Sequence, residues 1–225
     1  KEYKLDFISI GGKENVEAGI MRAEKEIVDM TTLAMNMLNK VQTGFQPNIA
    51  EFVETYIEEL SSSEDYADQM QEKLTNYIVK CSQMSVTDKT QNNLSIMLRI
   101  VDEIENMTDD CYSIALLIHR SVRKQTTISR EDMERLYPYM ELVLQFSQFI
   151  KENLNTHLSS EKLKLAETIE DQIDMYRAQL KRVARTRLES GADVRSELLY
   201  IDIVRHIEKI GDRAFAISEA LAQTQ

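Results

Sequence analysis

The scarcity of helix-breaking residues restricts this chain to long, uninterrupted elements. Only six Gly and two Pro occur in 225 residues, which is less than globular proteins usually contain. Between them, apolar residues recur every three or four positions, the spacing that places them on one face of an α-helix. The pattern predicts an all-α protein built from six helices.

The apolar period and the turn residues locate these helices. We expect them over residues 14–42, 47–84, 88–120, 129 to the loop before 158, 158–189, and 193 almost to the end. Gly44 suits a left-handed cap after the first helix, and Gly191 ends the fifth. Ser129 and Asp132 form a capping-box pattern, whereas Pro138 either kinks or restarts the helix that they open.

The helix lengths favour a duplicated architecture. Helices of about 30 residues joined by short loops pack against antiparallel neighbours. We therefore predict two three-helix bundles in series, over residues 14–121 and 129–225, with the polar and basic residues 122–128 as the link. Residues 1–13 lack the helical period and are predicted to form a tether or a short extended segment laid on the bundle.

Charge and cysteine content narrow the classes of partner. The 38 acidic and 27 basic residues give a net charge of −11, which repels nucleic acid and favours cations. Cys81 and Cys111 do not form a Cys-x-x-Cys pair, so we expect two reduced, packed thiols in a cytosolic protein. The chain lacks a phosphate-binding glycine loop and a catalytic Ser/His/Asp order, so it is not predicted to be an enzyme.

One acidic motif recurs along the predicted helices: Glu, three other residues, then Asp. It places two carboxylates on one helix face, where like charges cost about 0.2–0.5 kcal/mol per pair. The pairs in the second, third, fifth and sixth helices are Glu64/Asp68, Glu105/Asp109, Glu170/Asp174 and Glu208/Asp212. The first and third pairs are 106 residues apart, and the second and fourth are 103 apart. This regular offset indicates an internal duplication.

Two kinds of contact can offset the repulsion between the carboxylates of each pair. Either metal ions are held between facing helices, or Arg99, Arg205 and Lys209 form ion pairs with the carboxylates. Carboxylate oxygens favour hard or borderline cations such as iron, manganese or magnesium. Under the first explanation all eight carboxylates are candidate ligands, and we expect the second half of the chain to bind an ion first.

The sixth predicted helix carries the most specific motif. Residues 202–214 read Asp-Ile-Val-Arg-His-Ile-Glu-Lys-Ile-Gly-Asp-Arg-Ala, and this run resembles the signature of the PhoU family. Residues 99–109 carry a weaker copy, with Thr108 where the second copy has Gly211. The PhoU domain is a three-helix unit commonly present twice, so the resemblance extends over residues 14–223. It implies metal binding through the four Glu/Asp pairs.

The resemblance also implies a regulatory role. PhoU proteins are negative regulators of phosphate uptake and signalling, and a related domain forms the cytoplasmic C-terminal part of bacterial sodium/phosphate cotransporters. The absence of an initiator Met and the tether-like residues 1–13 favour the cotransporter reading over a free-standing regulator. The expected partners are a transmembrane transporter part or phosphate-signalling proteins, together with a second copy in a homodimer. A helical scaffold without metal is the remaining alternative.

Basic residues gather late in the fifth predicted helix, namely Arg177, Lys181, Arg182, Arg185 and Arg187. Cations near a helix C-terminus interact favourably with the helix dipole. We therefore interpret this group as structural, with a patch for a partner as the alternative. His206, on a charged helix face, is expected to be a surface group or to lie behind the metal ligands.

Overall fold

The computed structural model describes residues 1–6, 13–45, 49–126 and 128–225. Within these ranges the chain forms six helices and no strand, which confirms the all-α prediction. Their bounds are α1 Lys13–Thr43, α2 Ile49–Ser82, α3 Asp88–Arg123, α4 Arg130–Asn153, α5 Ser160–Glu189 and α6 Val194–Ala222. The third helix thus continues into the segment expected to be the link. None of the described helices has both the length and the apolar character that a membrane span requires.

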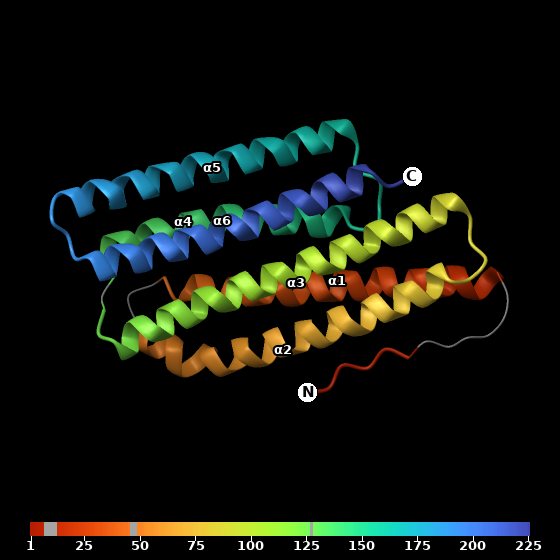
Figure 1. Ribbon diagram of the computed structural model, residues 1–225, viewed down its shortest axis with the longest axis horizontal. Helices are drawn as coiled ribbons and strands as arrows, with labels where there is room; N and C mark the ends of the chain where they lie inside the picture. Colours follow the sequence, from red (N-terminus) through yellow and green to blue (C-terminus); the bar gives the residue numbers. More distant parts are fainter. Residues whose placement is uncertain (7–12, 46–48, 127) are drawn as a thin grey trace.

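The helices form two bundles that lie side by side. α1, α2 and α3 pack against one another, as do α4, α5 and α6. α3 also packs along α6, and α1 packs against α4 (Figure 1). The expected pair of three-helix bundles is confirmed, but the bundles follow one another only in the sequence. In space they lie alongside each other rather than end to end.

One hydrophobic core runs through both bundles. The helices α3 and α6 contribute more buried apolar residues than any other pair of helices, among them Ile104, Ile207 and Ile210. Burying such a side chain stabilises the fold by about 1.5–3 kcal/mol. The outer helix α5 buries only four residues, namely Ala166, Ile173, Leu180 and Ala184. The polar positions where α5 meets α6 therefore stay close to solvent.

Capping residues define the helix ends. The Ser129 side chain accepts a hydrogen bond from the Asp132 N–H at 3.1 Å, as the capping-box pattern predicts. Gly191 has a φ of +86°, the left-handed conformation that glycine adopts after a helix. The expectation of a left-handed cap at Gly44 is wrong, because its φ is not positive. Glycine is needed there for space, since a Cβ would lie 3.1 Å from the side chain of Phe52.

The structure describes one of the two prolines whose effects on the helices the sequence predicts. Pro138 lies inside α4, which runs through it without ending. Proline lacks an N–H group and so removes one helical hydrogen bond, but the helix does not restart there. Pro47, the expected start of the second helix, lies outside the described residues.

The first six residues pack against α1 and α2. Tyr3 is buried, and its hydroxyl donates a hydrogen bond to Glu26 on α1 at 2.8 Å. Its backbone N–H donates to the side-chain oxygen of Gln69 on α2 at 3.0 Å. Residues 1–6 thus lie on the first bundle, while residues 7–12 of the predicted tether lie outside the described part of the chain.

Candidate metal sites

Carboxylates from α2 and α3 converge in the first bundle. Oxygen atoms of Glu64, Asp68 and Asp109 all lie within 4.8 Å of one another. Glu105 stands one turn before Asp109 on α3 and interacts with the carboxyls of Asp109 and Asp68. We call these four residues the first acidic cluster. It forms because α2 and α3 pack together, and each presents two carboxylates on one face.

Carboxylates from α5 and α6 converge in the same way in the second bundle. Oxygen atoms of Glu170, Asp174 and Asp212 lie within 4.8 Å of one another. Glu208 stands one turn before Asp212 on α6, and we call these four the second acidic cluster. The three converging residues occupy equivalent positions in the two bundles, so the duplication seen in the sequence extends to the geometry.

The first acidic cluster concentrates negative charge without a cation. Burial, followed by contact with Asp109 and Asp68, raises the pKa of Glu105 to about 9. Burial and the same two aspartates raise the pKa of Glu64 to about 8. Among the described residues, no Lys or Arg forms an ion pair with this cluster. The raised pKa values of Glu64 and Glu105 favour protonated carboxyls at these two positions, or a cation bound beside them.

The second acidic cluster contains a buried oxygen atom without a donor. Burial, then contact with Asp212, raises the pKa of Glu170 to about 8. Its Oε2 atom is buried and has no hydrogen-bond partner among the described residues. Gly211 leaves space beside it, since a Cβ at position 211 would lie 3.7 Å from this oxygen and 3.3 Å from Ile173. A proton or a cation can satisfy this oxygen, and no described protein group does.

Two basic residues distinguish the second cluster from the first. Arg177 on α5 donates to the Glu208 carboxylate, and the Lys181 ammonium lies 3.6 Å from the same carboxylate. Arg177 also lies 4.0 Å from Asp174. Burial raises the pKa of Asp174, and the charge of Arg177 lowers it. The second cluster is therefore partly neutralised by protein cations.

The cations suggested by the sequence are not the ones that meet the clusters. Arg205 pairs with Asp202 at 3.4 Å, and within the described residues Arg99 and Lys209 form no ion pair. From the sequence, Arg177 and Lys181 are expected to interact with the dipole of the fifth helix. The signal for Arg177 was its position three residues after Asp174, which places both on one helix face.

His206 and Arg187 make other contacts. The Nδ1 atom of His206 lies 3.0 Å from an Asp110 carboxylate oxygen, so this side chain joins α6 to α3. Arg187 donates two hydrogen bonds of 2.5 Å to Asp132 on α4. Both side chains connect helices and lie outside the acidic clusters.

The donor sets fit hard divalent cations. Each converging group offers three carboxylates and no histidine or cysteine. Oxygen-only sites of this kind suit magnesium, manganese or iron, and the negative charge favours any divalent ion. The unpaired Glu170 oxygen and the burial and neighbouring carboxyls that raise the pKa values of Glu64 and Glu170 disfavour fully ionised clusters. A bound cation at either group would relieve this repulsion and join two helices.

Comparisons with solved structures place the fold of this chain in one structural class, the all-α protein built from two three-helix units. No model of a known family matches the sequence, and no curated protein matches it. Solved structures do match. PhoU from Pseudomonas aeruginosa superposes with a TM-score of 0.80 and 14% identity, over 91% of this chain and 96% of that chain.

Two further structures agree. The phosphate transport system regulatory protein PhoU from Streptococcus pneumoniae gives a TM-score of 0.78 at 16% identity, over 92% of this chain and 94% of that one. A putative PhoU-like phosphate regulatory protein from Shewanella oneidensis gives a TM-score of 0.65 at 12% identity, over 93% of this chain and 98% of that one. The chain has the PhoU fold over nearly its whole length, and the predicted resemblance is confirmed at the level of the fold.

Proposed function

We propose that this chain is a metal-binding regulatory domain that controls phosphate transport. The observation that carries the proposal is the presence of equivalent carboxylate groups in both halves of a PhoU fold. Two of the similar structures are described as phosphate regulatory proteins, which supports the same role here. The role is regulatory rather than catalytic, because the clusters lack a nucleophile or a histidine base beside the candidate ligands.

The first acidic cluster is the stronger candidate for a bound cation. Among the residues that the structure describes, no Lys or Arg pairs with its four carboxylates, whereas Glu208 of the second cluster already pairs with Arg177 and Lys181. This favours an order opposite to the one expected from the motif in residues 202–214. Iron, manganese or magnesium held between α2 and α3 would stabilise their packing, by an amount set by the ion's affinity and concentration.

Metal analysis of purified protein tests the binding. We expect Glu64→Ala/Asp109→Ala to lose most of the bound metal, and Glu208→Ala/Asp212→Ala to lose a smaller part, with helicity unchanged in both. Glu58→Ala/Glu72→Ala is the matched control, because these acidic residues of α2 are exposed and lie outside the cluster. Equal metal content in all four proteins would show that the clusters are not ligands.

The regulatory role requires a test in cells. Phosphate uptake is measured for the complete encoded protein, for a version without residues 14–225, and for one that lacks both acidic clusters, at matched expression. We expect the deletion and the cluster variant to weaken the suppression of uptake in phosphate-rich medium without abolishing transport. Identical responses in all three would remove the regulatory role and leave a helical scaffold without metal.

The placement of this domain in the cell is part of the same proposal. We favour the cytoplasmic C-terminal part of a sodium/phosphate cotransporter, held at the inner face of the membrane, over a free-standing phosphate regulator. The support is the sequence resemblance. Hydrophobic spans encoded upstream of Lys1 would distinguish the two, and a homodimer stays a prediction for either.

A further inference from the structure

A segment without acidic residues interrupts this acidic chain. Between Asp110 and Glu131 there is no Asp or Glu, whereas Arg120, Arg123 and Lys124 follow one another closely. These three side chains are exposed at the C-terminal end of α3. In a chain with a net charge of −11, this end of the molecule presents a local positive surface.

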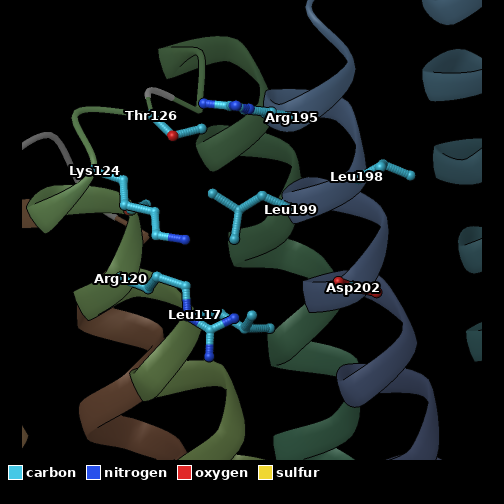
Figure 2. A pocket seen from close by; sticks show the side chains of 9 residues that line it. Leu117, Arg120, Lys124, Thr126, Arg195, Leu198, Leu199 and Asp202 are labelled. Carbon is cyan, nitrogen blue, oxygen red and sulfur yellow. The ribbon is translucent and has the colours of Figure 1, made fainter.

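A hollow of about 580 Å³ lies between this end of α3 and the start of α6. We call it the α3–α6 groove; its lining includes Leu117, Arg120, Lys124, Arg195, Leu198 and Leu199. Figure 2 shows Lys124 reaching from α3 and Arg195 from α6 toward the space between the two helices, with Leu199 between them. The groove thus combines basic rims with an aliphatic wall.

A second hollow widens this surface. It has a volume of about 420 Å³ and shares Arg120 and Lys124 with the α3–α6 groove. Several aliphatic side chains around the two hollows are exposed to solvent, namely Leu116, Val122, Val194 and Leu198. Exposed aliphatic groups interleaved with basic ones are typical of protein interaction sites rather than of inert surface. The whole surface is too extended for one small anion.

In the described part of the chain, the basic residues of the groove are not engaged in close ion pairs, although Arg195 interacts electrostatically with the Asp193 carboxylate. Among the described residues, Arg120, Lys124 and Arg195 form no ion pair. The dipole of α3 accounts for cations at its C-terminus, but Arg195 lies in the first turn of α6, where the dipole disfavours a cation. The nearby Asp193 carboxylate already accepts hydrogen bonds from the backbone and hydroxyl of Ser196. An external anion can therefore pair with these three side chains.

We propose that the α3–α6 groove docks an acidic segment of a partner protein that also carries aliphatic or aromatic side chains. Carboxylates of the segment pair with Arg120, Lys124 and Arg195, and its apolar side chains contact Leu117, Leu198 and Leu199. Asp202 lines the same groove but pairs with Arg205 at 3.4 Å, so the three basic side chains stay available to carboxylates of the segment. The concave shape suits protruding side chains better than a flat layer of headgroups.

The test selects random peptides of about three helical turns on the purified chain. We expect the selected peptides to be rich in Asp and Glu, with Leu, Ile or Phe among them. Arg120→Ser/Lys124→Ser/Arg195→Ser should weaken their binding at least about tenfold by fluorescence anisotropy. The matched control is Arg99→Ser/Arg182→Ser/Arg185→Ser, which removes the same charge from exposed positions elsewhere and should change binding less than about twofold.

The apolar contact has its own pair of variants. Leu198→Ser should weaken the selected peptides about fivefold, whereas Leu165→Ser, an exposed leucine of α5, should not. The proposal is overturned if no acidic peptides are selected, if both triple variants weaken binding equally, or if acidic peptides without apolar residues bind as tightly. Phosphatidylglycerol vesicles that sediment the wild-type chain but not the groove triple variant would assign the surface to a membrane and also overturn it.

Discussion

Arg177 makes the two acidic clusters chemically unequal. It pairs with Glu208, and Lys181 lies beside the same carboxylate. The positions 106 residues earlier hold Gln71 and Thr75, so the first bundle has no cation at either equivalent place. Two carboxylate groups with the same backbone arrangement therefore differ in net charge by two elementary charges contributed by these side chains. The difference predicts unequal affinities for a divalent cation.

Removal of the two protein cations should strengthen cation binding by the second cluster. In a background of Glu64→Ala/Asp109→Ala, we expect Arg177→Gln/Lys181→Gln to tighten Mn²⁺ binding about tenfold, because Glu208 becomes free to act as a ligand. Isothermal titration calorimetry measures the change. Arg182→Gln/Arg185→Gln is the control with the same charge change at exposed positions. If Arg177→Gln/Lys181→Gln leaves the affinity for Mn²⁺ unchanged, Glu208 takes no part in binding.

Glu105 should destabilise the protein when no metal is present. Its raised pKa means that folding at pH 8 requires this carboxyl to take up a proton or to remain charged beside Asp109. We expect Glu105→Gln to raise the free energy of unfolding by about 0.5 kcal/mol in the presence of a chelator, since it removes like-charge repulsion. Urea denaturation measures this. Added Mn²⁺ should then stabilise the variant less than the wild-type protein, and an equal gain in both would argue against a role for Glu105.

At the scale of the helices, the sequence predicts the elements better than their partners. The apolar period locates all six helices, since it depends only on which face each helix buries. It does not say what covers that face, so the packing of α3 along α6 was not foreseen. The prediction for Gly44 is wrong for a similar reason: a Cβ at this position would also lie 3.2 Å from Ile118, which is distant in sequence and near in the fold.

The candidate site shows the same limit. The Glu/Asp spacing predicts which carboxylates share a helix face, and the duplication predicts which helices carry them. The pairing of Glu208 with Arg177 depends on the rotation of α5 against α6 and on a long, flexible side chain, neither of which is encoded in spacing. The raised pKa values likewise depend on burial, which only the packed helices provide.

Separate bundles should be incomplete folding units. The first bundle, residues 13–126, buries one side of α3 against the second bundle. The second bundle, residues 128–225, buries one side of α6 against the first. Expressed alone, each is expected to be less stable and to self-associate, because an apolar face is left uncovered. Light scattering after size exclusion measures this, and mixing the two should yield a one-to-one complex. If both bundles are stable monomers that do not bind each other, the shared hydrophobic core is contradicted.

For the whole molecule, stability without metal should fall as pH rises. The folded-state pKa values of Glu64 and Glu170 are about 8, above the ordinary value of 4.5. Between these pH values the folded protein holds more protons than the unfolded chain, so the free energy of unfolding decreases with rising pH. Urea midpoints measured with a chelator from pH 4.5 to 8 test the sign. Saturating Mn²⁺ should flatten or reverse the slope, and a rise without metal would contradict the raised pKa values.

The contacts between the two bundles join each helix to its own counterpart, α3 to α6 and α1 to α4. A contact of this kind is self-complementary, as in a two-fold symmetric dimer of identical subunits. Joining two such subunits by gene duplication requires no new contact surface between them. Each copy can then acquire substitutions that the other copy lacks. Arg177 in one half and Gln71 in the other are a difference that an ancestral dimer of identical chains could not have had.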